Sequence, residues 1–371
     1  MTECRILSVE PRRKRCPVVV LAATLLIVVT ACVPDGGGRR CLAEEGSSGF
    51  GASPSPLRPV RPEKARGDLA EVIDDFVQKI PAGAVGPRSV YDIPDRREID
   101  RFRRGLACVQ QDFLDVAGAV LKTLNYEVVK FEDEETDREI IMVREKERRI
   151  HHWGTFIVDP GSSSNLTVEV SQPCPDDLCE RGDLFTHLVG VEAFRKVRAR
   201  YLFITGAAPD ANGQFNPDPT RRGACRRRRI CADAAHNRRT MFHQVHVRVA
   251  TRLVYQPHAF FFRDHPDLKT QDIDVVVSNG KARFRDDSLS TAVFNALKKT
   301  DEFGVCRFEG EASKCNTSRL NATGNVQSIR TNARRGSFIS VEAEMRTIGK
   351  GNRLELLAET VACTMAPAPD C

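Results

Sequence analysis

The second half of the chain alternates between extended and helical segments, and this alternation constrains the fold most. Strands are expected at 166–170, 201–205, 253–256, 273–278 and 338–341, and helices at 182–197, 233–250 and 288–299. A strand that is followed by a helix at this spacing is typical of parallel sheets, because the crossover helix packs back onto the sheet. We therefore predict an α/β fold with a mixed, largely parallel sheet that carries helices on both faces.

A helical lead-in and a small antiparallel meander are expected before this part. Apolar residues at Leu69, Val72, Ile73, Phe76 and Ile80 follow a helical period, and a longer helix is predicted over 97–124. Three extended segments follow at 126–131, 139–143 and 155–158, the last running into a turn signature at 159–161. We expect them to form a meander at one edge of the sheet.

The N-terminus resembles a bacterial lipoprotein signal. A basic stretch at 12–15 precedes an apolar run at 18–29, which is short for a membrane span and ends at the sequence Val-Thr-Ala-Cys. Residues 1–31 would then be a signal peptide, and Cys32 would carry lipid at the bacterial cell envelope, facing the periplasm or the exterior. An ordinary secretory signal and an uncleaved anchor are the alternatives. Residues 32–66, rich in Gly, Ser and Pro, are expected to be a flexible tether, and 67–371 a single α/β domain.

The 13 cysteines include four close pairs: Cys174/Cys179, Cys225/Cys231, Cys306/Cys315 and Cys363/Cys371. Without the two cysteines of the signal and the lipidated one, an even number remains, which favours disulfides in an oxidising compartment. Structural zinc is the alternative, but the chain has no CxxC pairs.

The charge balance gives no reason to expect nucleic acid as a partner, because the chain has 56 Lys and Arg and 50 Asp and Glu, for a net charge of +6. Arginines cluster at 221–229 around Cys225 and Cys231. This loop is interpreted either as a solvated surface or as a cationic site that binds phosphate or carboxylate groups.

Polar residues follow the expected strands at their carboxyl ends, where reactive groups collect in open α/β sheets. The segments 168–173, 235–246, 325–327 and 340–346, taken in this order, resemble N-formylglutamate amidohydrolase and zinc carboxypeptidase-like hydrolases over about 153–346. The resemblance implies a zinc ion held by histidines and a carboxylate, with Asp176 as a ligand and Glu342 as the general base. It further implies that Arg346 receives a substrate carboxylate.

Two positions depart from that pattern. The chain has Gln172 and Ala208 where such relatives carry histidines, and a hydrolytic zinc site needs about three protein ligands. The chemistry is therefore either lost or relocated. A relocated site would use His243 and His246, expected on one face of the 233–250 helix with His236, together with His258; the alternative is that these histidines are ordinary polar or boundary residues.

His151, His152 and Trp153 form a further cluster, interpreted as a cap of the sheet edge or as a surface that stacks on a ligand.

The sequence thus favours a membrane-tethered exported protein with a degenerate zinc-hydrolase-like domain that binds an anionic small molecule, peptide, glycan or lipid headgroup. The alternative is a zinc-dependent amidohydrolase or carboxypeptidase that cleaves an amide next to a carboxylate. Fold alone does not decide between them.

Overall fold

The computed structural model describes residues 58–82, 91–146, 149–176, 183–211, 231–281, 288–308, 315, 320–349, 351–368 and 371. The predicted signal peptide, the lipidation site Cys32, most of the tether and the arginine-rich loop lie outside these residues. None of the helices in the described part of the chain combines the length and the apolar character needed to cross a bilayer.

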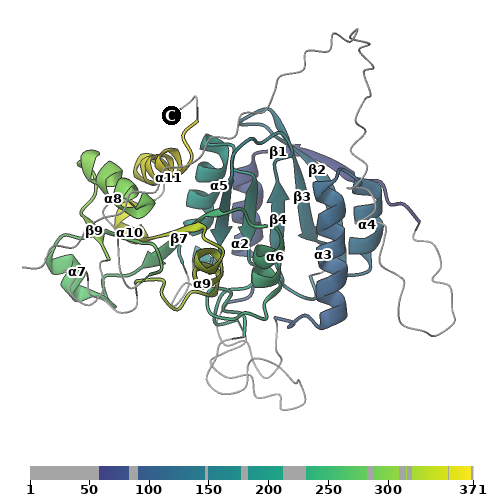
Figure 1. Cartoon of the computed structure of the whole chain (residues 1–371), viewed down its shortest axis with the longest axis horizontal. Helices are drawn as coiled ribbons and strands as arrows, with labels where there is room; N and C mark the ends of the chain where they lie inside the picture. Colours follow the sequence, from purple (N-terminus) through teal and green to yellow (C-terminus); the bar gives the residue numbers. More distant parts are fainter. Residues whose placement is uncertain are drawn as a thin grey trace, which may run out of the picture.

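A single ten-stranded sheet organises the molecule (Figure 1). Its strands are β1 (Glu63–Gly67), β2 (Tyr126–Asp133), β3 (Arg138–Glu145), β4 (Thr155–Val158), β5 (Leu166–Val170), β6 (Tyr201–Ile204), β7 (Leu253–Phe260), β8 (Val275–Ser278), β9 (Val305–Arg307) and β10 (Ser337–Glu344), arranged in the order β1-β2-β3-β4-β6-β5-β7-β10-β8-β9. The four central strands β6, β5, β7 and β10 run parallel to one another. Antiparallel pairs join β2, β3, β4 and β6 on one side and β10 and β8 on the other.

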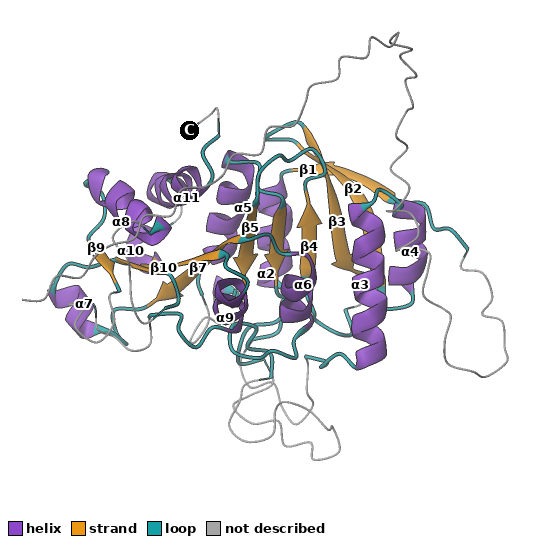
Figure 2. Ribbon diagram, viewed as in Figure 1, coloured by secondary structure: helices purple, strands orange, loops and turns teal. Residues whose placement is uncertain are grey.

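Helices cover both faces of the sheet (Figure 2). They are α2 (Leu69–Gln78), α3 (Arg96–Gln110), α4 (Leu114–Lys122), α5 (Thr186–Lys196), α6 (Met241–Val249), α7 (Pro266–Thr270), α8 (Leu289–Lys299), α9 (Val326–Ala333), α10 (Met345–Ile348) and α11 (Asn352–Met365). The apolar layer on one face includes residues of α2, α5, α8 and α11, and the layer on the other face includes residues of α3, α4 and α6. The predicted α/β architecture, with a mixed and mostly parallel sheet, is confirmed.

Side-chain alternation assigns the two faces of the central strands. Val168 of β5, Tyr255 of β7 and Val341 of β10 belong to the apolar layer under α5 and α11. The residues that follow them, Glu169, Gln256 and Glu342, therefore point to the opposite face, because successive side chains in a strand alternate. These are polar residues inside the molecule, and they define the part of the sheet in which a site is expected.

Two predicted helices differ from the observed ones. The helix expected over 97–124 is interrupted, because Asp112 adopts a left-handed backbone conformation (φ 61°) between α3 and α4. The helix expected over 233–250 begins only at Met241. Thr240 precedes it with an extended backbone and accepts a hydrogen bond from the His243 N–H, which makes it the N-cap.

Two smaller differences concern the sheet. The meander β2-β3-β4 is present, but β1, which starts inside the segment expected as tether, pairs with β2 and takes the edge. The short strand β9 was not expected at all.

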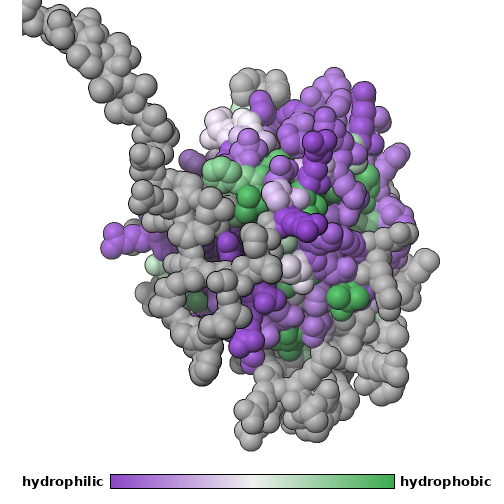
Figure 3. All heavy atoms as spheres, turned by 90° about the vertical axis from the view of Figure 1, so that its right-hand side faces the viewer, coloured by the Kyte–Doolittle hydropathy of each residue, from purple (hydrophilic) through white to green (hydrophobic). Residues whose placement is uncertain are grey.

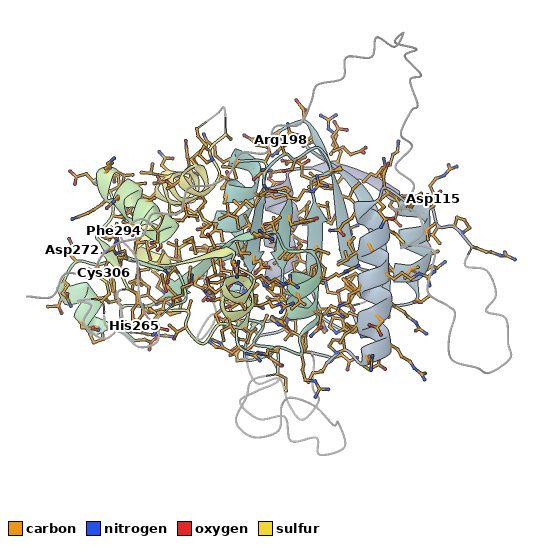
Figure 4. All side chains as sticks on the ribbon, viewed as in Figure 1. Asp115, Arg198, His265, Asp272, Phe294 and Cys306 are labelled. Carbon is orange, nitrogen blue, oxygen red and sulfur yellow. A yellow bond between two sulfur atoms is a disulfide. The ribbon has the colours of Figure 1, made fainter. Side chains whose placement is uncertain are left out.

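All seven cysteines in the described part are disulfide-bonded. Cys306 pairs with Cys315, and Cys363 pairs with Cys371. Figure 4 places Cys306 with Phe294 and Asp272 at the end of the molecule farthest from α3 and α4. Cys108, Cys174 and Cys231 are disulfide-bonded as well.

The face that carries α3 and α4 is largely hydrophilic. In Figure 3, apolar residues of the described part lie in separate groups among hydrophilic ones.

Candidate functional site

A cleft of about 500 Å³ lies at the carboxyl ends of the central parallel strands. Its lining combines Gln172 after β5, His258 of β7, Glu342 of β10 and the loop that leads into α9. His258 and Glu342 stand directly opposite each other in the parallel register of β7 and β10. Their side chains therefore leave the sheet on the same face, which explains how residues 84 positions apart reach one cleft.

His258 is a buried cation in this cleft. Its Nδ1 atom lies 2.7 Å from Oδ2 of Asp183, a residue that was not expected at the site. Burial opposes the charged imidazole, but the attraction of Asp183 and Glu342 outweighs it and raises the pKa of His258 to about 9. Asp183 is brought to this place because it bridges to Pro173 and because its N–H donates to the carbonyl of Gln172.

Glu342 is a buried carboxyl group that titrates near neutral pH. Burial raises its pKa, His258 lowers it, and Asp183 raises it again, so that the pKa of Glu342 is about 7. The predicted general base therefore lies in the cleft with a pKa suited to proton exchange at neutral pH.

The mouth of the cleft holds a second imidazole. His236 Nδ1 lies 2.9 Å from Oδ2 of Asp233, and this hydrogen bond raises the pKa of His236. The other carboxylate oxygen of Asp233 accepts a hydrogen bond from the Gln172 amide at 2.9 Å. The side-chain N–H of Gln172 is thus engaged by the same carboxylate that holds His236.

A buried chain of hydrogen bonds links the His258 ring to Glu169 and His246. Its Nε2 atom lies 3.1 Å from Gln256 Oε1, and the Gln256 amide donates to Glu169 at 2.8 Å. The other oxygen of Glu169 contacts His246 Nδ1 at 2.7 Å, and Asn325 donates to Gln256 Oε1 at 2.7 Å. Because each polar group has a partner, the chain fixes the position of the His258 ring.

His243 and His246 do not reach the cleft. His246 is the far end of the buried chain just described, and His243 stacks beside it with a ring separation of 5.8 Å. Burial, with His246 and nearby arginines, lowers the pKa of His243 to about 3, so it is a neutral core residue. His236 is not part of their helix, so the predicted common helix face of the three histidines is wrong.

The remaining predicted residues also lie elsewhere. Asp176 is exposed, and its N–H donates to Gln78 at the end of α2. Ala208 is buried in the apolar layer on the opposite face of the sheet. A histidine at this position would therefore not reach the cleft. Arg346 is exposed, with its guanidinium 4.7 Å from the ring centre of Phe261. None of these three lines the cleft.

A larger cavity of about 820 Å³ lies between α2 and the strands β2 to β4. Four of its charged lining residues form two ion pairs, Lys79 with Asp75 and Arg144 with Glu127. The convergent titratable groups with raised pKa values lie instead in the smaller cleft, which is the better candidate site.

The donor set of the cleft does not fit a hydrolytic zinc ion. Such an ion needs about three ligands whose atoms surround one point. Asp183 and His258 already contact each other, and the neighbouring Gln172 amide is a poor zinc ligand. In the described part of the chain, the carboxylates and the histidines of the cleft form no group of three with ligand atoms within 4.8 Å of one another.

Several solved structures are similar to this chain. N-formylglutamate amidohydrolase from Ralstonia eutropha JMP134 is 15% identical, with a TM-score of 0.37 over 57% of this chain and 95% of that one. A succinylglutamate desuccinylase from Silicibacter sp. TM1040 is 10% identical, with a TM-score of 0.31 over 63% of each chain. The LapA aminopeptidase of Legionella pneumophila is 10% identical, with a TM-score of 0.32 over 88% of this chain and 81% of that one.

Searches at the level of sequence give no match: no family model and no curated protein matches the chain. The resemblance drawn from the sequence thus has counterparts among solved structures, at low identity.

Proposed function

We propose that this protein binds an anionic ligand in the cleft, without hydrolysing it, while tethered to the membrane of a bacterial cell envelope. The tether rests on the N-terminal sequence that resembles a lipoprotein signal, with Cys32 as the lipidated residue. The binding function rests on one observation above all: in the described part of the chain, the carboxylates and histidines of the cleft do not bring three ligand atoms within 4.8 Å of one another, and the Gln172 amide is bonded to Asp233.

Each imidazole of the cleft is balanced by a neighbouring carboxylate, His258 by Asp183 and His236 by Asp233, so the protonation of Glu342 decides how well the cleft accepts an anion. His258 carries a positive charge, and the raised pKa of His236 favours a second one at the mouth. Below pH 7 Glu342 is mostly protonated, so its hydroxyl can donate a hydrogen bond to a carboxylate or phosphate oxygen.

The start of α9 adds to this field. Residues 320–325 line the cleft and lead directly into the helix, and Gly324 lies against the His236 ring. The positive end of the helix dipole therefore lies beside the two histidines, although the first N–H groups of α9 already bond to the Ala235 carbonyl and to the Asn325 side chain.

The test uses an N-acylglutamate, because this probe offers both a carboxylate and the amide bond that a hydrolase would cleave. Calorimetry is expected to show saturable binding, and mass spectrometry is expected to recover the probe intact after long incubation. His236→Ala removes the imidazole at the mouth and is expected to weaken binding, whereas Glu71→Gln, an exposed change on α2, is the matched control.

A second candidate function follows from Glu342. A carboxyl group with a pKa of about 7 suits a general base that activates water against an amide. In that case the probe is cleaved, the rate increases with pH through about 7, and Glu342→Gln abolishes it. Intact probe under all these conditions excludes this candidate.

A further inference from the structure

We infer that Asp92, Glu98 and His151 form a zinc site outside the cleft, at the point where α3 meets the turn between β3 and β4. One ligand atom from each of the three side chains lies within 4.8 Å of the other two. In the described part of the chain, no other set of three carboxylates, histidines or cysteines meets this condition. An imidazole with two carboxylates is a ligand set that zinc commonly uses.

The three ligands are held in place by contacts that need no metal. The His151 ring stacks on the Trp153 indole, with ring centres 4.1 Å apart and planes inclined by 16°. The indole N–H donates to the backbone carbonyl of Asp92, and the Asp92 N–H donates to the carbonyl of His151. These contacts fix the positions of His151 and Asp92 relative to each other and to the buried indole of Trp153.

Glu98 is positioned from the other side. It is the third residue of α3, and its Oε2 atom accepts a hydrogen bond from the N–H of Asp95, which closes a capping box. The carboxylate is thus directed back across the start of the helix toward Asp92 and His151.

The local charge favours a cation. Two carboxylates face a single imidazole, whose Nδ1 atom is 3.2 Å from Asp92 Oδ2. A divalent ion relieves the repulsion between the carboxylates. It also joins α3 to the turn that presents Trp153, so bound zinc is expected to stabilise this part of the fold. None of the three residues lines the cleft.

Trp153 is the single tryptophan of the chain, so its fluorescence reports on this site alone. Zinc added to the purified, metal-stripped full-length protein is expected to change the emission in a saturable way, with one equivalent bound by calorimetry and full reversal by EDTA. Calcium is expected to bind much more weakly, because it prefers six to eight oxygen ligands.

Glu98→Gln is the decisive variant, because glutamine preserves the capping box and leaves His151 and Trp153 in place. It is expected to weaken zinc binding at least about tenfold, as is His151→Ala. Glu71→Gln, also in the first turn of a helix, and Glu342→Gln, in the cleft, should bind zinc like the wild type.

Unchanged affinity in Glu98→Gln would overturn the proposal, as would zinc binding without any change in Trp153 emission. Loss of zinc binding in Glu342→Gln would move the metal to the cleft and would contradict the proposed function instead.

Discussion

Glu342→Gln should make the protein more stable, although it removes a buried ionisable group from the cleft. The folded carboxyl has a pKa of about 7 against an ordinary value of 4.5. Between these values the unfolded chain releases the proton while the folded chain keeps it, so stability falls as pH rises through this window. The difference of about 2.5 pKa units corresponds to a cost of about 3 kcal/mol at pH 8 and less than about 1 kcal/mol at pH 5.

The amide keeps the shape of the side chain and removes its charge. In the variant, His258 is left with Asp183 as a charge-balanced pair, instead of two carboxylates sharing one cation. The loss of one attractive partner for His258 offsets part of the gain, so about 3 kcal/mol is an upper figure.

The assay is urea unfolding followed by Trp153 fluorescence at pH 5 and pH 8, with Glu71→Gln as an exposed control. The variant is expected to exceed the wild type by more at pH 8 than at pH 5. An advantage that does not grow with pH, or a variant that is less stable at pH 8, would refute the reasoning.

Three further predictions concern the sheet and the cleft. Glu169→Leu removes the buried carboxylate that His246 and the Gln256 amide contact. It should lower the free energy of unfolding by about 3 kcal/mol in urea titrations. Gly154→Ala places a Cβ atom 2.1 Å from the Ile204 carbonyl oxygen at a φ of 118°, so its melting temperature should fall clearly below that of the wild type. Gln172→His adds an imidazole to the cleft and should add a second equivalent of bound zinc in elemental analysis, whereas an unchanged zinc content would show that the cleft cannot complete a metal site.

The sheet was predictable because its signal is local. Strands such as β5 and β10 are short runs of apolar and β-branched residues, and the helices between them have a clear period. The missed strands β1 and β9 are largely exposed or half-buried edge strands with little apolar pattern. The break at Asp112 was missed because the surrounding sequence keeps a helical period on both sides.

Two site residues could be found from the sequence, and their partner could not. His258 and Glu342 stand at the ends of central strands, where the register of a parallel sheet brings them together. Asp183 reaches the cleft through a loop whose path depends on its bridge to Pro173, and no sequence period encodes such a contact. The resemblance implied Asp176 as a ligand, but Asp176 is exposed and lies outside the cleft.

The pH dependence of ligand binding tests the central claim most directly. If the cleft holds an anion beside Glu342, bound anion must favour the protonated carboxyl, and by linkage affinity must rise as pH falls. With a pKa of about 7, the protonated fraction of Glu342 rises from about 10% at pH 8 to about 90% at pH 6, so affinity for an N-acylglutamate should increase up to about tenfold. Glu342→Gln should remove most of this dependence while the probe stays intact. Affinity that is highest at pH 8, or cleavage of the probe, would contradict the account.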